Sequence, residues 1–200
     1  MNAATTNRIP SPDECYALLG KYGVPEHIIQ HSEMVCRVAV CLAEHLNEQG
    51  QDLNIPELQA AALLHDLTKM QGLAEGQDHA KSGNEVLAKL GFERIGEIVG
   101  EHIKLKEKAG LQVLSEEEIV NYSDKRVMHT SVVSLADRFA DLEERYGANG
   151  LDANAMERIA GLQVKTYELE NRIFAPLDFT PGELPLLLEH GGREERRQKE

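Results

Sequence analysis

The chain has 200 residues, 42% of them hydrophobic, and a formal net charge of -13. This length and composition suit one domain with a full hydrophobic core. No apolar stretch approaches the roughly 18 residues that a membrane-spanning helix needs. The negative charge disfavours a surface for duplex DNA or anionic lipid, because binding to either depends on Lys and Arg. We therefore expect neither nucleic acid as the principal partner nor a membrane.

Cysteine usage and the N-terminal sequence indicate the compartment. Cys15, Cys36 and Cys41 are odd in number and lack a C-x-x-C spacing, which argues against a disulfide framework and against a thiolate zinc site. The first residues contain no apolar signal-peptide core. We therefore expect a reducing compartment and a cytoplasmic location.

Apolar residues recur at spacings of three and four along most of the chain, which is typical of amphipathic helices. Ser11-Pro12 followed by Glu14 has the form of a helix start. The pattern predicts helices over residues 12–22, 25–49, 54–72, 78–90, 93–102, 115–129, 134–146 and 153–174, and a short apolar turn at 184–188. No alternating strand pattern competes over more than a few residues. The sequence therefore predicts an all-α fold.

The predicted helices divide the chain into a single compact multi-helix domain and an addition at its C-terminal end. We expect the domain at 11–150 and a helical extension that packs on it at 151–190. The polar segment 1–10 and the charged tail 191–200 are predicted to be flexible. The long helix in the extension could instead pack on a second chain, which leaves a homodimer open.

Six ionisable residues fall on the apolar faces of five predicted helices. They are His31, His65, Asp66, His79, His102 and Asp124. Any one of these histidines alone would be an ordinary core residue, but two inward-facing carboxylates without partners would be costly to bury. A divalent cation bound by imidazoles and carboxylates removes that cost. We therefore predict that the six residues hold one or two divalent metals. His129, near a predicted helix end, is interpreted instead as a partner of the helix dipole.

The order of these six residues resembles the HD superfamily of metal-dependent phosphohydrolases, specifically the small bacterial HDIG-type members. The strings YGVPEHIIQHSEMVCRVA, AALLHDLTK and NYSDKRV strengthen the likeness, which covers roughly Pro12 to Tyr146. One departure is Leu67-Thr68, where the family often has Ile-Gly or Ile-Ala. The resemblance implies an HD-domain bundle of helices.

The resemblance also implies how the metals are held. The first metal would be bound by His31, His65, Asp66 and Asp124. Asp66 would bridge to a second metal completed by His79 and His102, although in relatives with one metal these two histidines would contact the substrate or act as an acid. The implied metals are iron, manganese, cobalt or zinc, and a mixed His/Asp shell does not choose among them.

The activity implied by the resemblance is hydrolysis of a phosphoester or phosphoanhydride bond in a small nucleotide-like substrate by metal-activated water. Asp66 and Lys69 are the predicted catalytic residues, and Lys69, Lys104 and Arg126 the predicted substrate-binding residues. The segment Lys104 to Leu114 is expected to form a pocket wall or lid. A di-iron oxygenase and a non-catalytic nucleotide-binding signalling module remain as alternatives, and the identity of the substrate is open.

Overall fold

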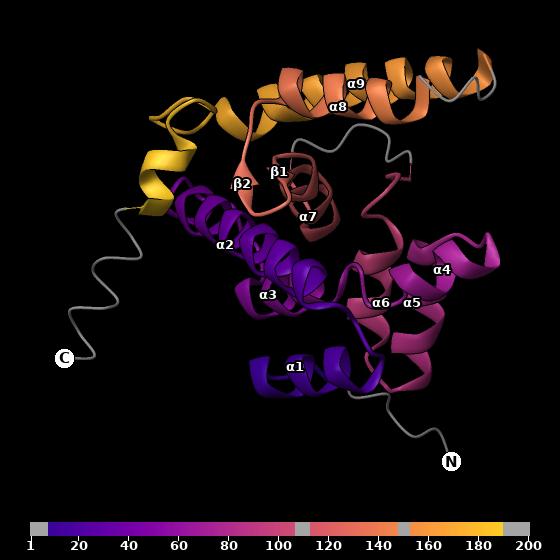
Figure 1. The fold of residues 1–200 in the computed structure, drawn as a ribbon. Coiled ribbons are helices and arrows are strands. Elements are labelled where there is room, and N and C mark those ends of the chain that lie inside the picture. Colours follow the sequence, from indigo (N-terminus) through magenta and orange to yellow (C-terminus); the bar gives the residue numbers. More distant parts are fainter. Residues whose placement is uncertain (1–7, 107–112, 148–152, 190–200) are drawn as a thin grey trace.

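The computed structural model describes residues 8–106, 113–147 and 153–189 (Figure 1). The helices are α1 (Pro12–Lys21), α2 (Glu26–Glu48), α3 (Ile55–Leu64), α4 (Lys69–Glu75), α5 (His79–Lys89), α6 (Glu93–Gly100), α7 (Glu116–Lys125), α8 (Leu135–Gly147) and α9 (Ala153–Phe174). Two short strands, β1 (Val127–Met128) and β2 (Ser131–Val132), pair in antiparallel orientation. Residues 184–189 are also helical. The prediction of an all-α fold is confirmed.

The helices are arranged around the pair α2 and α3. Helix α2 packs on α3 and α7, and α1 packs on α3. Helices α5 and α6 pack together on one side of the molecule, where α4 joins them, and α8 and α9 lie side by side along its upper edge in Figure 1. The long α2 therefore connects the two sides of the fold.

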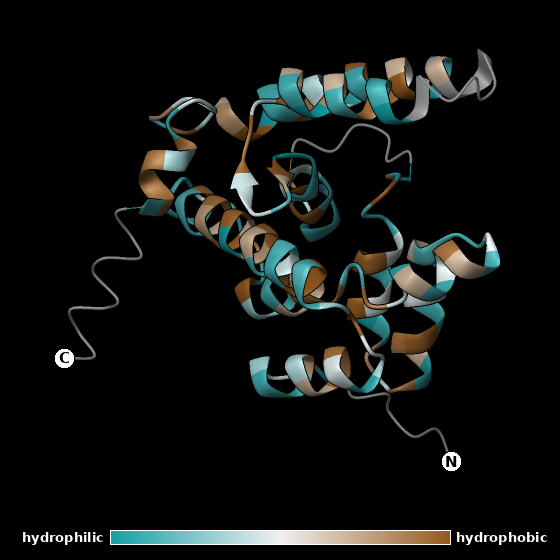
Figure 2. Cartoon of the chain, in the orientation of Figure 1, coloured by the Kyte–Doolittle hydropathy of each residue, from teal (hydrophilic) through white to brown (hydrophobic). Residues whose placement is uncertain are grey.

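The apolar pattern of the helices matches this arrangement. Along α2, brown and teal bands alternate in Figure 2, and Val35, Val38 and Leu42 on its apolar stripe are fully buried. Helix α3 differs, since every residue from 60 to 64 is buried. A helix that is apolar on all sides belongs at the centre of a core. The residues that follow α3 therefore begin in the protein interior.

The predicted helix 54–72 is interrupted after Leu64, where α3 ends, and the chain becomes helical again at Lys69, where α4 begins. Residues 65–68 form turns before α4 begins. The amides of Leu67 and Lys69 donate to carbonyl oxygens three residues earlier in the chain, each at 3.0 Å, a tighter winding than that of an α-helix. This break places two successive ionisable side chains at the buried end of α3 rather than along a helix.

The predicted helix 115–129 is also too long, because α7 ends at Lys125 and a β-hairpin follows. Val127 pairs with Val132 across the hairpin. His129 lies at its turn with a φ of 56°, a left-handed conformation that is uncommon for residues other than glycine. Two-residue strands are too short to produce a recognisable alternation in sequence.

Several predictions fall on residues that the structure does not describe. Residues 1–7 of the predicted flexible N-terminus, the tail 191–200 and residues 107–112 of the predicted lid lie outside the described ranges. Within those ranges, no helix combines the length and apolar character needed to cross a membrane.

An ion-pair cluster joins α3, α6 and α7. The guanidinium of Arg94 lies 3.1 Å from Glu57, 2.9 Å from Glu116 and 2.5 Å from Glu117. Glu117 is buried, and burial raises its pKa, but the hydrogen bond and positive charge of Arg94 outweigh burial and lower that pKa to about 2. The ionised form of Glu117 is therefore the form that the fold favours.

We expect acid to weaken the fold through Glu117. Its pKa lies below the ordinary 4.5, so its stabilisation is complete above that pH and is lost as the pH falls toward about 2. Urea unfolding of the wild type should therefore lose more stability between about pH 6 and about pH 3 than unfolding of Glu117→Gln. The exposed Glu97, 3.5 Å from the same Arg94, provides the control, and Glu97→Gln should keep the pH dependence of the wild type. A Glu117→Gln protein with that same dependence would contradict the assignment.

Candidate metal centre

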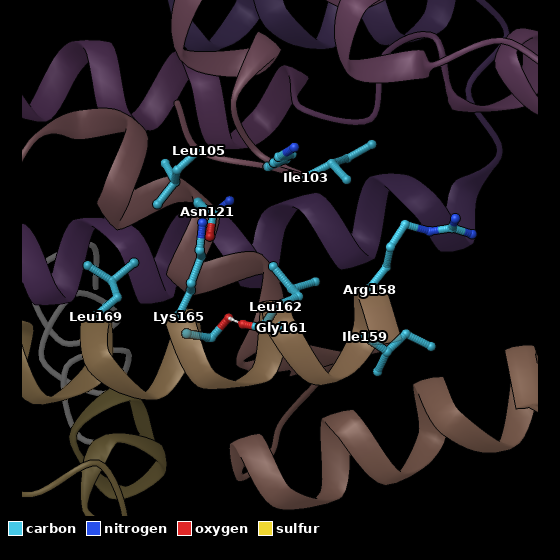
Figure 3. Close-up of a pocket in the computed structure, with 11 residues that line it drawn as sticks. Ile103, Leu105, Asn121, Arg158, Ile159, Gly161, Leu162, Lys165 and Leu169 are labelled. Atoms are coloured by element: carbon cyan, nitrogen blue, oxygen red, sulfur yellow. Dashed lines mark hydrogen bonds between the residues drawn. The ribbon is translucent and has the colours of Figure 1, made fainter. Parts of the chain in front are cut away.

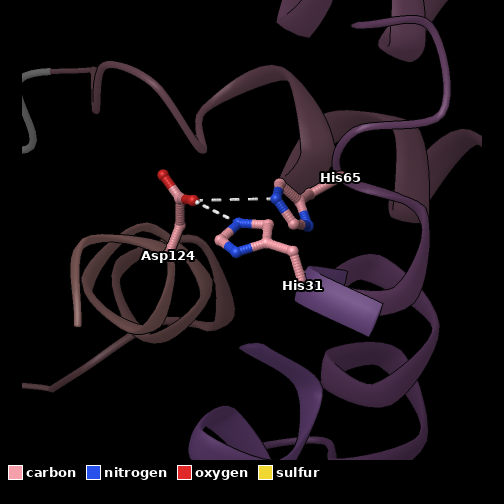
Figure 4. Close-up of side chains that lie close together, drawn as sticks. All are labelled: His31, His65 and Asp124. Carbon is pink, nitrogen blue, oxygen red and sulfur yellow. Dashed lines mark hydrogen bonds and ion pairs between the residues drawn. The ribbon is translucent and has the colours of Figure 1, made fainter. Parts of the chain in front are cut away.

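The structure brings the six predicted metal-binding residues together in two groups of three. The groups are His31, His65 and Asp124, and Asp66, His79 and His102. Within each group the candidate ligand atoms lie within 4.8 Å of one another. Figure 4 shows the first group, in which both imidazole rings turn toward one carboxylate oxygen. Each group could hold a metal ion.

Asp66 links the two groups. Its Oδ1 atom lies 3.2 Å from Nε2 of His79 and 3.8 Å from Nε2 of His102. Its Oδ2 atom lies 3.4 Å from Nε2 of His65, which belongs to the other group. Each carboxylate oxygen has its own lone pairs, so this side chain could serve an ion in each group.

Backbone carbonyl groups orient three of the four imidazole rings. The Nδ1 atoms of His31, His65 and His102 lie 3.0, 2.8 and 2.7 Å from the carbonyl oxygens of His129, Ala62 and Val99, respectively. Because a carbonyl oxygen can only accept, each Nδ1 donates, and a neutral ring then carries a lone pair on Nε2. Metal-binding histidines are held in the same way by outer hydrogen bonds.

The Nε2 atoms of His31 and His65 face carboxylate oxygens, which in their ionised form can only accept. His65 Nε2 is buried and has no hydrogen-bond partner among the described residues. The Nε2 atoms of His79 and His102 lie 3.2 Å apart, and Nε2 of His31 lies 3.2 Å from Oδ1 of Asp124. Buried acceptors that face one another are unfavourable, and a cation between them removes the conflict. Imidazole and carboxylate together suit a divalent transition metal, so these residues fit a metal centre.

The protonation states of the cluster also suit metal binding. Burial raises the pKa of the Asp66 carboxyl, but the His65 imidazole 3.4 Å away and the hydrogen bond of His79 hold that pKa well below its usual range. Against the effect of burial, the same carboxylate raises the pKa of His65, so a proton on His65 and a metal ion compete for one place. At Asp124 the His31 imidazole 3.2 Å away and the positive charge of Lys125 outweigh burial and keep the pKa of the carboxyl low. Burial and the charge of His65 lower the pKa of His102 to about 3. Ionised carboxylates and a neutral imidazole are the forms that bind metals.

Two residues that the sequence analysis did not place in the site hold the backbone of His102. Lys125 Nζ donates to the His102 carbonyl oxygen at 2.7 Å, and Asn121 Nδ2 donates to the same oxygen at 3.0 Å. The buried Lys125 Nζ also lies 3.6 Å from Oδ2 of Asp124. Asn121 and Lys125 are four residues apart on α7, which places both on one helix face. That spacing was the feature of the sequence from which their shared role could have been predicted.

His129 also has a role that the sequence analysis missed. Its carbonyl oxygen accepts the hydrogen bond from His31 Nδ1, so its backbone orients a candidate ligand. The interpretation of His129 as a partner of the dipole of a helix ending there is wrong, because α7 ends at Lys125. A backbone contact of this kind leaves no signal in the identity of the side chain.

Of the three predicted substrate-binding residues, the structure brings one to the cluster. Lys69 Nζ lies 2.7 Å from Oδ2 of Asp66, and its side chain is 35% exposed. Lys104 instead lines a cavity to which none of the six cluster residues contributes. Arg126 is buried, and its guanidinium donates to the backbone at Val133 and Pro181. Lys69 therefore forms part of the edge of the cluster, and Arg126 joins elements of the fold.

Comparison with known proteins places this geometry in a family. The model of the family described as HD domain matches residues 28–141. The chain is 32% identical over 169 residues to a tRNA (cytidine(56)-2'-O)-methyltransferase of Thermoplasma volcanium, an alignment that covers 77% of this chain and 46% of that protein. A protein of the same name from Picrophilus torridus is 31% identical over 140 residues, which cover 64% of this chain and 39% of that protein. The chain thus spans less than half the length of these curated relatives. No solved structure matches it significantly.

The names of the relatives contradict the predicted activity. Methyl transfer to a ribose is not the hydrolysis of a small phosphorylated substrate, so the prediction of a metal-dependent phosphohydrolase is overturned. Methyl transfer is also different from both alternatives, oxygenation by a di-iron pair and nucleotide signalling without catalysis. The ligand shell indicates metal binding, but the surroundings of a metal decide the reaction.

The prediction that nucleic acid is not a principal partner is contradicted by the same names, since both relatives are named for tRNA. Net charge is a sum over the whole chain, and it does not describe one local site or a protein of twice this length.

The family match remains the firmest of these comparisons. It covers more than half of the 200 residues, and all six residues of the two candidate ligand groups lie within it. The helical fold and the convergence of these side chains agree with it. The chain belongs to the HD domain family.

Proposed function

We propose that this chain is a metal-binding HD domain that takes part in the 2'-O-methylation of tRNA and binds the RNA at its metal centre. One observation carries the proposal: a protein named as a tRNA 2'-O-methyltransferase matches 77% of this chain at 32% identity. The two groups of candidate ligands support a metal-dependent role within that process.

The role proposed for this domain is RNA binding rather than methyl transfer itself. Nucleotide-type cofactors of α/β enzymes bind at the carboxyl ends of parallel strands. The described ranges contain only β1 and β2, which have two residues each and run antiparallel. We therefore assign methyl transfer to another domain or to a partner protein.

The metals proposed for the site are iron, manganese, cobalt or zinc. When bound, such ions supply positive charge and open coordination positions for phosphate oxygens. The accessible edge of the cluster includes Lys69 and His79, whose side chains are 35% and 21% exposed. A phosphate group of the RNA would lie at this edge, where the ammonium group of Lys69 would donate to it. Asp66 holds Lys69 in place at 2.7 Å.

The negative net charge of the chain favours contact with tRNA at one point over contact across a broad surface. Binding of RNA over a broad surface requires many Lys and Arg side chains opposite phosphates, and a chain with a net charge of -13 opposes it. A metal centre concentrates positive charge at one point without a basic surface. The affinity for tRNA should therefore depend strongly on bound metal.

The proposed domain organisation follows the packing of the helices. We propose residues 11–150 as the HD domain and 151–190 as an extension that packs on it through contacts of α9 with α7 and α8. The three cysteines are free, and we propose that the protein works in a reducing compartment, the cytoplasm.

We expect Asp66→Asn to weaken tRNA binding. With fluorescence anisotropy of a labelled tRNA transcript, the metal-loaded wild type should bind at least about tenfold more tightly than Asp66→Asn or than wild type treated with a chelator. Asp52 is exposed and remote in sequence from the cluster, so Asp52→Asn is the matched control and should bind as the wild type does. Equal tRNA affinity in the presence and absence of metal would overturn the proposed role.

A further inference from the structure

A cavity of about 610 Å³ lies beside α9 (Figure 3). One wall is α9, and the opposite wall includes Ile103 and Leu105, which follow α6 directly. Its volume is in the range of small-molecule binding sites. None of the six cluster residues lines it.

The walls of the cavity are aliphatic. Ile103, Leu105, Ile159, Leu162 and Leu169 line it, and within the described ranges no aromatic side chain does so. Bases of nucleotides are usually bound by stacking on aromatic rings. An aliphatic wall favours burial of an alkyl group, which needs no directional partner.

Cationic side chains lie around the aliphatic walls. Lys104, Arg158 and Lys165 line the cavity, although the chain as a whole carries a net charge of -13. Among the lining residues that the structure describes, none is acidic. A local positive potential of this kind attracts an anionic group. The cavity therefore combines an apolar interior with an anion-attracting rim.

A glycine keeps part of this volume open. Gly161 lies within α9 and lines the cavity, and a Cβ atom added there would meet no heavy atom within 4 Å. Glycine is unfavourable inside a helix, so a larger residue would be better for α9 itself. A larger side chain at this position would fill the cavity without a clash.

We propose that this cavity binds a small amphipathic anion, a molecule with an alkyl body and one anionic head group. The alkyl body lies against the leucine and isoleucine side chains, and the head group lies near Lys104 and Arg158. The bound molecule would contact Asn121, which is buried in the cavity wall and donates to the carbonyl oxygen of His102. The site is thus adjacent to the metal cluster but independent of the role proposed for it.

Calorimetric titration of the full chain with decanoate tests the proposal. We expect saturable binding at one site, at least about tenfold weaker in Gly161→Leu because the added side chain occupies the cavity. Ala160 is the neighbouring residue on α9 and is exposed, so Ala160→Leu is the matched control and should bind decanoate as the wild type does. Circular dichroism should show the same helical content in both variants.

The head group and the body are tested separately. The double variant Lys104→Gln with Arg158→Gln should weaken decanoate binding about five- to tenfold and leave decanol binding unchanged, because only the anion interacts with the lost charges. Decanoate binding that is absent, or that persists unchanged in Gly161→Leu, would overturn the site. Adenosine monophosphate that binds more tightly than decanoate would overturn the alkyl body, and decanol that binds as tightly as decanoate would overturn the anionic head group.

Discussion

Asp66→Asn should remove metal from both halves of the cluster. The Asp66 oxygens face His79 and His102 on one side and His65 on the other. An amide carries no negative charge and offers one oxygen in place of two, so both sides lose an anionic ligand. After saturation with Mn²⁺ and removal of free ions, metal analysis should find about two equivalents in the wild type and less than about half an equivalent in the variant.

Variants of single histidines should separate the two halves. His31 belongs to only one of the groups, so His31→Ala should keep about one equivalent of metal. Asp52→Asn, at an exposed position, should keep the metal content of the wild type, and circular dichroism should show the same helical content in every variant. Full metal content with wild-type affinity in Asp66→Asn would show that its carboxylate is not a ligand.

Arg126→Met should destabilise the fold more than any other substitution discussed for this chain. The buried Arg126 donates to the carbonyl oxygens of Val133 at 2.7 Å and Pro181 at 2.8 Å, and lies 3.2 Å from Glu170 and 2.5 Å from the Tyr122 hydroxyl. Removal of the guanidinium takes the donor from both carbonyl oxygens and the positive charge from beside the Glu170 carboxylate, which keeps the hydrogen bond donated by the Tyr122 hydroxyl. Loss of one partner of a buried ion pair costs about 3–5 kcal/mol.

Urea unfolding measures this loss, and a second arginine provides the comparison. Arg172 pairs with Glu118 across the surface, and its side chain is 41% exposed, so Arg172→Met should cost less than about 1 kcal/mol. Arg126→Lys should fall between the wild type and Arg126→Met, because an ammonium group cannot reach partners in three directions. Similar losses in Arg126→Met and Arg172→Met would contradict the structural role of Arg126.

Elements that form from local sequence could be predicted closely. The last helix, predicted over 153–174, is α9 (Ala153–Phe174), because a continuous apolar stripe ends just before Pro176. The turns at 65–68 and the hairpin after α7 could not be predicted in this way. Both depend on contacts of the folded chain, which local periodicity does not contain.

The candidate site also has a part that local sequence predicts and a part that depends on tertiary packing. Its six side chains could be predicted because ionisable groups on apolar helix faces need a partner in the core. The contact of the His129 carbonyl oxygen could not be predicted, because its partner His31 lies 98 residues away in the sequence. The contact between Lys125 and the His102 backbone is non-local as well. Local pattern thus indicates which side chains enter the interior, and tertiary packing decides what orients them.

The predicted activity failed for a different reason. Imidazoles and carboxylates on apolar faces indicate a place that could hold an ion, and they carry no information on what that ion would do. The net charge of -13 was an argument about the surface as a whole. Neither quantity describes a single exposed edge such as the one that Lys69 and His79 form beside the cluster.

The expectations for metal content and tRNA binding depend on cations that occupy the space between the four imidazoles and two carboxylates. The most direct measurement is a crystal structure of Mn²⁺-loaded protein with anomalous difference maps recorded near the manganese edge. Peaks within bonding distance of the His31–His65–Asp124 and Asp66–His79–His102 groups are the predicted result. Maps of fully loaded crystals that place the ions elsewhere, with these six side chains hydrogen-bonded only to one another, would contradict it.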